Sequence, residues 1–337
     1  MDNSEKQTQL LLSFIEEWNS GEGISAFTSG STGAPKEISL TQQQIVRSAK
    51  RTLNFFGISK KNRLHCAISF EFIGGKMMIA RSLIAGCRLT FSSPSLAPSP
   101  PDGEVALMSV VAAQMPHILS HREEFATVKA FLIGGSAIDN RLWDRIVASG
   151  INAWESYGMT ETASHIAIRR IVGNSDRRPR FVALPGIRLS AGPDGCLVIT
   201  DGDIRVETND LTRIFPDGSF ILTGRKDDVI VSGGLKILAP DVENALRPFM
   251  SSGVAQFIIG SLPDEVWTSR LVLVCVPENG IEDYYELKKS LEQSLEFIPE
   301  QVLPRKKRPK EVYIMKNLPL TPSGKIKRHF SQDDLLQ

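Results

Sequence analysis

Apolar and polar positions follow two alternating periods along the first half of the chain. Helical spacing runs over Gln9–Trp18 and from Thr41 to about Phe56, with Thr41 as a plausible N-cap. Short apolar runs between further helical stretches are typical of buried strands. The expected strands are Ile24–Thr28, His65–Phe70, Arg88–Ser92, Val105–Val110, Lys129–Ile133 and Ile151–Glu155, and the later helices Gly75–Ala85, Ala112–Leu119 and Arg141–Ala148. This alternation predicts an α/β fold with a mostly parallel sheet.

The pattern changes after Gly173. Short strands separated by Pro-Asp-Gly and Asp-Gly turns predict a small β-rich subdomain at about 181–224. Its expected strands are Ile187–Leu189, Cys196–Thr200, Ile204–Glu207 and Ser219–Thr223. A second change at 225–234 leads to helices and strands that form an α+β module, namely Ala239–Pro248, Val254–Gly260, Leu271–Val276 and Asp283–Leu295. We therefore expect a large N-terminal domain over 1–224 and a small C-terminal domain over 235–337.

The composition excludes several classes of protein. The 337 residues include 39 Lys and Arg against 38 Asp and Glu, for a net charge of +1. This balance argues against a nucleic-acid partner, and the ordinary hydrophobic content of 42% argues against disorder. The sequence contains no apolar run of about 20 residues, the length that would predict a membrane-spanning helix. The four cysteines are far apart and the first residues are polar, so we expect a reduced, cytoplasmic protein.

The segment from Phe27 to Lys36 carries the strongest chemical signal. It reads Phe-Thr-Ser-Gly-Ser-Thr-Gly-Ala-Pro-Lys and follows a predicted strand. Glycines let backbone N–H groups converge on one point, hydroxyls add donors, and lysine adds a cation, which together suit a phosphate. On composition alone, a mobile loop is the alternative. The candidate phosphate-binding residues are Thr28, Ser29, Gly30, Ser31, Thr32, Gly33 and Lys36.

The complete string resembles the phosphate-binding loop of the adenylate-forming superfamily, which comprises acyl-CoA synthetases, luciferases and peptide-synthetase adenylation domains. The resemblance implies ATP and Mg²⁺ as ligands, a small carboxylic acid as substrate and CoA as co-substrate. It covers nearly all of the chain. It also predicts further motifs in a fixed order downstream.

The stretch Trp154–Thr162 resembles the second core motif of that superfamily. The resemblance implies that Tyr157 packs against adenine, with Gly158 and Met159 beside it. It assigns Thr160 to the α-phosphate and Glu161 to Mg²⁺, for which a carboxylate oxygen is a suitable ligand. Upstream, the segment Gly134–Ala137 resembles the turn that lines the adenine, which makes Gly135, Ser136 and Ala137 nucleotide-binding candidates.

Two later motifs fall near the expected domain boundary. Asp210 stands in Thr-Asn-Asp, where the superfamily usually has Thr-Gly-Asp, and would bind the ribose hydroxyls. Asn209 replaces the glycine, and asparagine tolerates a positive φ. In the linker motif, Arg225 corresponds to a ribose- or phosphate-binding arginine and Asp227 to the hinge, within 225–234. Lys236 lies in the segment that approaches the acceptor thiol.

The segment Leu318–Arg328 resembles the C-terminal motif of the superfamily. There Lys325 corresponds to the catalytic lysine that bridges the carboxylate and the α-phosphate. A positioned ammonium stabilises the negative charge that develops on those oxygens. The resemblance also implies that the C-terminal domain is mobile and swings between two reaction poses.

Local strings favour a particular branch of the superfamily. Gly158–Ile166 resembles the o-succinylbenzoate–CoA ligases of menaquinone biosynthesis, whose substrate carries two carboxylates. Arg81, Arg169 or Arg170 could meet the second carboxylate. Two features depart from the superfamily: Phe72 stands where many relatives have histidine, and the phosphate loop starts close to Met1. We therefore expect a shortened N-terminal domain, with an acyl pocket that has fewer walls or is completed by a partner chain.

The sequence thus predicts an AMP-forming acid–CoA ligase that acts through an acyl-adenylate. Two alternatives stay open. One is another acyl-CoA ligase or an adenylation enzyme that loads a carrier protein. The other is a non-catalytic nucleotide-binding regulatory protein. The sequence also leaves a homo-oligomer open.

Overall fold

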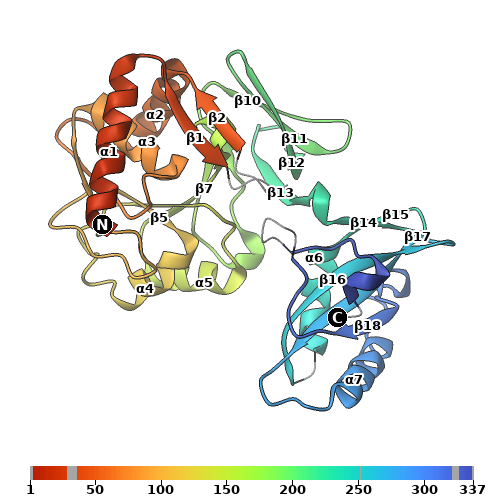
Figure 1. Cartoon of the computed structure of the whole chain (residues 1–337). Helices are drawn as coiled ribbons and strands as arrows, with labels where there is room; N and C mark the ends of the chain where they lie inside the picture. Colours follow the sequence, from red (N-terminus) through yellow and green to blue (C-terminus); the bar gives the residue numbers. More distant parts are fainter. Residues whose placement is uncertain (1–2, 29–35, 251, 321–325, 336–337) are drawn as a thin grey trace. The chain divides into compact units, whose positions relative to one another are not determined.

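The structure is a computed structural model that describes residues 3–28, 36–250, 252–320 and 326–335. These residues separate into two units (Figure 1). The first consists of residues 3–28, 36–208 and 212–221, and the second of residues 209–211, 222–250, 252–320 and 326–335.

A seven-stranded sheet forms the centre of the first unit. Its strand order is β4-β3-β5-β6-β7-β8-β9. The pairs from β4 to β7 are parallel, and β8 and β9 extend the sheet in antiparallel fashion. The predicted α/β fold with a mostly parallel sheet is confirmed. The strands are β3 (Arg63–Cys66), β4 (Arg88–Phe91), β5 (Leu107–Val111), β6 (Phe131–Gly134), β7 (Ala153–Met159), β8 (Ser164–Arg170) and β9 (Val182–Ala183).

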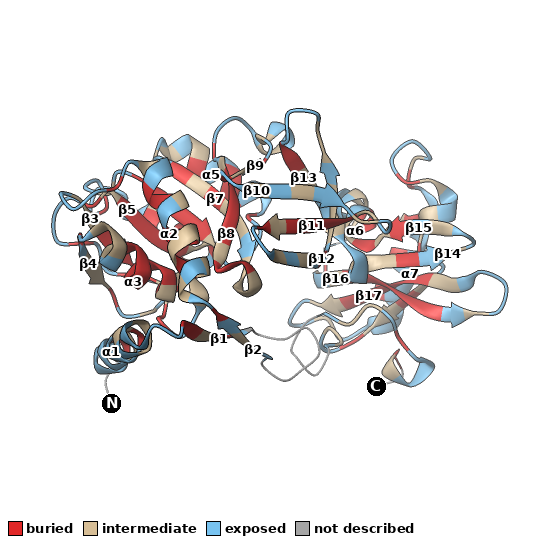
Figure 2. Cartoon of the chain, turned by 90° about the horizontal axis from the view of Figure 1, so that it is seen from above, coloured by how far each residue is buried: buried red, intermediate tan, exposed pale blue. Residues whose placement is uncertain are grey.

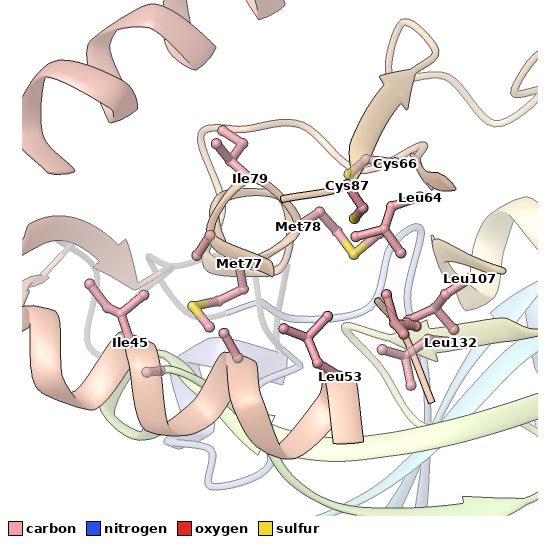
Figure 3. Close-up of a cluster of buried hydrophobic side chains, with 14 of the residues drawn as sticks. Ile45, Leu53, Leu64, Cys66, Met77, Met78, Ile79, Cys87, Leu107 and Leu132 are labelled. Carbon is pink, nitrogen blue, oxygen red and sulfur yellow. The ribbon is translucent and has the colours of Figure 1, made fainter. Parts of the chain in front are cut away.

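Helices cover both faces of this sheet. Figure 1 shows α2 and α3 on one side of the strands, with α4 and α5 on the other. Each face has its own apolar core, one around Met77 and Met78 of α3 (Figure 3) and the other around Trp143 of α5. The helices are α1 (Asn3–Ser20), α2 (Gln42–Phe56), α3 (Ile73–Ala85), α4 (Met115–Ser120) and α5 (Asn140–Ser149).

The ends of helix α2 agree with the prediction because local signals in the sequence determine them. Thr41 accepts a hydrogen bond from the backbone N–H of Gln44, whose side chain bonds back to the N–H of Thr41. This capping box starts the helix. Gly57 ends it in the left-handed region, with φ of 63°.

Two smaller sheets belong to the N-terminal part of the chain. Strands β1 (Ile24–Thr28) and β2 (Lys36–Leu40) form an antiparallel hairpin of their own. The expected β-rich region contains a four-stranded sheet, although β12 is much longer than predicted. Its strands are β10 (Ile187–Ala191), β11 (Cys196–Asp201), β12 (Ile204–Ile214) and β13 (Phe220–Arg225).

The second unit is built on a three-stranded sheet. Strands β16 (Val254–Asp264) and β17 (Thr268–Pro277) are antiparallel, and β18 (Glu311–Ile314) adds a parallel strand. Helices α6 (Ala239–Leu246) and α7 (Tyr284–Glu296) pack against it around a core that includes Leu291.

Shorter elements complete the described chain. Strands β14 (Val229–Ser232) and β15 (Leu235–Leu238) form a second hairpin. Figure 2 shows buried residues concentrated in the strands of the larger sheets. Among the described residues, none of the helices has the length and apolarity needed to cross a membrane. The short helical turns are η1 (Ala112–Gln114), η2 (Thr160–Thr162), η3 (Ser175–Arg177), η4 (Lys226–Asp228), η5 (Arg247–Phe249), η6 (Arg305–Lys307) and η7 (Gln332–Leu335).

Candidate active site

The predicted phosphate loop connects the strands of the β1–β2 hairpin. Thr28 ends β1 and pairs with Lys36, which begins β2. Both strands contact the η2 turn, which carries Thr160 and Glu161. The hairpin therefore holds the ends of the loop beside the residues predicted to serve the α-phosphate and the metal. The remaining loop candidates lie outside the described residues, namely Ser29, Gly30, Ser31, Thr32 and Gly33.

Tyr157, Gly158 and Met159 lie within β7, two to four residues past the predicted strand end at Glu155. The β7–β8 pairing shifts register between Tyr157 and Gly158. A Cβ added to Gly158 would lie 2.2 Å from the carbonyl oxygen of Ser164. Only glycine fits this approach of two backbones, which turns the chain into η2.

Tyr157 stands in a small aromatic cluster. Its ring centroid lies 6.0 Å from that of Phe181 and 5.8 Å from that of Phe220, and those two rings stack on each other. Phe181 and Phe220 are buried, whereas Tyr157 is half-buried. The cluster fixes the orientation of a tyrosine ring that is still partly accessible, as stacking on a flat base requires.

The chain leaves η2 through an unusual backbone conformation. Ala163 and Ser164 have φ values of 50° and 87°, in the left-handed region that residues other than glycine rarely adopt. The Ser48 hydroxyl donates a 2.7 Å hydrogen bond to the carbonyl oxygen of Ala163. Thr162 also bonds to the Ser164 carbonyl. These contacts hold the strained turn directly behind Glu161.

A buried polar chain lies next to this turn. The Arg81 guanidinium donates to Nδ1 of His165 at 3.4 Å, and Nε2 of His165 lies 3.1 Å from the Thr52 hydroxyl. Burial, aided by the positive charge of Arg81, holds the pKa of His165 well below its usual range, so the imidazole is neutral. Burial lowers the pKa of Arg81 to about 10, so the guanidinium stays charged at neutral pH.

The turn predicted to line the adenine is held by Glu155, a residue to which the sequence assigned no role. The buried carboxylate of Glu155 accepts hydrogen bonds from the Ile138 N–H at 3.3 Å and from Nε of Arg169 at 2.7 Å. The Arg169 guanidinium also lies 4.2 Å from the centre of the Phe181 ring. A carboxylate within a predicted buried strand, here at its last residue, was the available signal, because such a group needs a partner.

A cavity of about 450 Å³ opens beside the same turn. Ser136 and Ala137 line it together with Arg141 and Arg145 of α5. Gly135 precedes them with φ of 86°, which lets the turn leave β6 sharply. Two of the three predicted adenine-turn residues therefore face open space.

In the second unit, three predicted residues come together. Arg225 bonds to Asp210 at 2.7 Å and to Asp227 at 3.3 Å. Asn209, which replaces the usual glycine, donates its side-chain amide to Asp227 at 3.4 Å. Asn209 lies in strand β12 and has no positive φ. The turn expected at this position is therefore not formed, and Asn209 serves instead as a hydrogen-bond donor to Asp227.

The remaining predicted residues lie elsewhere in the second unit. Lys236 is exposed in β15 and pairs with Val231 across the β14–β15 hairpin. Lys325 lies outside the described residues. The residues that bracket its segment, Leu320 and Ile326, form an antiparallel bridge.

Comparison with protein families gives two matches in the expected order. Residues 24–189 match the family of AMP-binding enzymes, and residues 241–325 match the AMP-binding enzyme C-terminal domain. The chain belongs to the AMP-binding enzyme family, which confirms the resemblance to adenylate-forming enzymes.

Several curated relatives of this chain share one name, 2-succinylbenzoate–CoA ligase. A 2-succinylbenzoate–CoA ligase from Listeria monocytogenes is 27% identical over 94% of this chain and 71% of its own length. A 2-succinylbenzoate–CoA ligase from Enterococcus faecalis is 25% identical over 90% of this chain and 67% of its own length.

Solved structures agree with this fold. An AMP-forming acyl-CoA synthetase/AMP-acid ligase II-like protein from Dyadobacter fermentans matches with a TM-score of 0.61 and 27% identity, over 95% of this chain and 91% of that one. The o-succinylbenzoate CoA synthetase of Bacillus subtilis, solved with ATP and magnesium ion, matches with a TM-score of 0.70 and 20% identity, over 90% and 68%.

Proposed function

We propose that this protein is an AMP-forming acid–CoA ligase whose acid is o-succinylbenzoate. One observation carries the proposal: the hairpin that bears the phosphate-loop sequence packs on the turn that bears Thr160 and Glu161. Lys36, which begins β2, and Glu161 of η2 thus belong to elements that contact each other. Family membership and relatives named 2-succinylbenzoate–CoA ligase support the same conclusion.

In the first step, the acid's carboxylate attacks the α-phosphorus of ATP, and pyrophosphate leaves. The loop residues and Lys36 hold the β- and γ-phosphates, and Thr160 contacts the α-phosphate. Tyr157 and the Gly135–Ala137 turn hold the adenine, while Asp210 and Arg225 bind the ribose. Lys325 offsets the charge that grows on the reacting oxygens.

Glu161 is suited to hold Mg²⁺, which would neutralise phosphate charge when bound. Among the described residues, its carboxylate has no hydrogen-bond or ion-pair partner, so its oxygens are available to a metal. The same residues contain no cluster of three or more side chains that could ligate a metal. Mg²⁺ commonly binds through one carboxylate, water and the substrate phosphates, which fits this arrangement.

In the second step, the CoA thiol attacks the acyl-adenylate carbonyl to form the thioester, and AMP leaves. We propose that the C-terminal domain, 235–337, turns about Asp227 between the two steps, withdrawing Lys325 and bringing Lys236 to the thiol. One protein can then stabilise two different transition states in succession.

The arginines support an acid with a second negative group. Arg169 is already engaged by Glu155, whereas Arg81 is fully buried and has no carboxylate partner among the described residues. A buried cation without a counter-charge is costly. A second carboxylate on the substrate would supply that charge. Arg170 is exposed at the end of β8.

We place the reaction in the cytoplasm, and the four free, buried cysteines support a reducing compartment. A homo-oligomer remains compatible with the proposal. CoA-dependent product distinguishes the ligase from an enzyme that loads a carrier protein. A regulatory protein would bind ATP without turnover.

The deciding measurement is acid-dependent ATP–pyrophosphate exchange across a panel of acids. We expect exchange with o-succinylbenzoate and much less with an analogue that lacks the second carboxylate. Adding CoA should then give a thioester and AMP. Bound ATP without exchange for any acid would instead favour the regulatory protein.

Lys325→Ala tests the assigned catalytic residue. Because the lysine acts on the transition state, the variant should lose exchange by about 100-fold or more while ATP binding is kept. Lys316→Ala, a lysine upstream of the motif, is the matched control. Unchanged exchange in Lys325→Ala would show that this role was assigned to the wrong residue.

A further inference from the structure

Arg328, at the end of the C-terminal motif, is a largely buried arginine whose guanidinium bonds to three different elements. Its side chain is only 9% exposed. Nε donates to Asp228 at 2.7 Å, and Nη1 donates to the Glu243 carboxylate and to the carbonyl oxygen of Ile259 at 2.8 Å. One guanidinium therefore joins η4, α6 and β16 within the second unit.

The backbone around Arg328 is fixed as well. The Ser261 N–H donates to the Arg328 carbonyl at 2.7 Å, and the Phe330 N–H donates to the Ser261 carbonyl at 2.8 Å. Phe330 packs so closely on β16 that a Cβ added to Gly260 would lie 2.2 Å from its ring. The chain from Arg328 onward is thus held along the edge of β16.

The described residues on both sides of 321–325 are tied to this anchor. Ile326 bridges Leu320, and the Lys327 N–H donates to the Pro319 carbonyl at 2.9 Å. The Lys327 ammonium also pairs with Asp334 at 2.7 Å. Arg328 lies three residues after Lys325, and its partner Asp228 directly follows Asp227.

We propose that Arg328 is a positioning residue: by fixing the chain directly after Lys325 to the η4 turn, it sets where the catalytic lysine lies relative to the hinge. The inference rests on the proposed function, in which Lys325 serves adenylation and Asp227 is the hinge. Arg328 itself touches no substrate. It acts by setting where Lys325 lies when the domain takes its first pose.

The consequence is confined to one half-reaction. A displacement of about 1 Å in a catalytic group can cost about 100-fold in rate. Lys325 acts in adenylation and is withdrawn for thioester formation. Loosening its anchor should therefore slow the first step selectively, which a general loss of stability would not do.

The test compares Arg328→Gln and Arg328→Lys in the full-length protein. Adenylation is measured by pyrophosphate exchange, and thioester formation by single turnover from preformed acyl-adenylate and CoA. We expect Arg328→Gln to lower the kcat of exchange by at least about tenfold with little change in KM for ATP. Thioester formation should stay within about twofold, and Arg328→Lys, which keeps the charge, should recover part of the loss.

Arg308→Gln is the matched control. The Arg308 side chain is 11% exposed, lies in the same unit and donates to the carbonyl oxygens of Leu303 and Ile298 near the end of α7. Within the described residues, its side chain makes no hydrogen bond or ion pair to η4. Its loss should lower stability without changing the ratio of the two half-reactions.

Limited trypsin digestion supplies a readout that does not depend on activity. Arg328→Gln should be cut after Lys325 faster than the parent protein, whereas Arg308→Gln should not. Equal slowing of both half-reactions, or unchanged cleavage after Lys325, would overturn the inference. If the parent protein shows no exchange, the proposed function fails, and the cleavage rates still decide whether Arg328 anchors the segment.

Discussion

Gly158 illustrates how strongly one residue can constrain the candidate site. Its neighbours across the strand pair are backbone atoms of Ser164 and His165, at 2.2 and 2.4 Å from the place of a Cβ. Backbone cannot yield as a flexible side chain can. The requirement at this position is therefore space, and not a special φ.

Gly158→Ala should destabilise the protein by about 3 kcal/mol or more, because two strands would have to separate. Gly150→Ala is the control, since Gly150 has φ of 73° but open space where a Cβ would stand. That change should lower the free energy of unfolding by only about 1–2 kcal/mol, the cost of placing alanine in the left-handed region. Urea denaturation measures both, and equal costs would contradict the steric explanation.

Among the elements, the Glu155–Arg169 pair connects β7, β8 and the turn predicted to line the adenine. Both side chains are largely buried, with 5% and 13% of their surface exposed. The pair orients the turn through the Ile138 N–H and holds a guanidinium against the Phe181 ring. Removing one member leaves the other as a buried charge without its counter-charge.

Glu155→Leu and Arg169→Met should each cost about 3–5 kcal/mol, and the double variant clearly less than their sum. The reason is that the double variant leaves no charge stranded. Chemical denaturation of all four proteins at one pH completes the cycle. Additive costs would mean that the two side chains stabilise the fold independently.

The elements also show what the sequence could predict. Helix α2 has a capping residue, an amphipathic face and a terminal glycine, so its bounds followed from local signals. Strand β2 has only two apolar residues, Ile38 and Leu40, and the pattern predicted no strand there. Strand β8 was missed because its register and burial depend on β7 and β9, which are tertiary partners.

The residues of the candidate site also fall into those that local motifs could predict and those that depend on tertiary partners. Tyr157, Thr160, Glu161, Asp210 and Arg225 could be named because each stands in a motif string. Glu155 and Arg328 could not be assigned roles, since their partners are 14 to 100 residues away in sequence. Arg308 is a further case, because its side chain is only 11% exposed although it ends a run of basic residues.

For the whole molecule, buried histidines link stability to pH. Burial, aided by the charge of Arg63, lowers the pKa of His65 to about 4 from 6.5. Its Nε2 has no hydrogen-bond partner among the described residues. The unfolded chain therefore binds this proton more readily than the folded chain, so stability is lost as pH falls from about 6.5 toward 4.

Between pH 7.5 and pH 5, His65 alone should account for about 2 kcal/mol of lost stability. His65→Gln removes the titrating group, and its amide can still bond to Thr90. The free energy of unfolding of the variant should thus fall less over this range than that of the parent. Parallel pH profiles for the two proteins would exclude His65 as the cause.

The β1–β2 hairpin forms a sheet of its own, separate from the larger sheets, and its neighbours include α1 and η2. A two-stranded ribbon is marginal by itself. It is therefore a natural unit of local unfolding, able to open while the seven-stranded sheet stays intact. Part of the free energy of nucleotide binding would be used to close that ribbon. Nucleotide should then slow amide exchange in the hairpin far more than in the core.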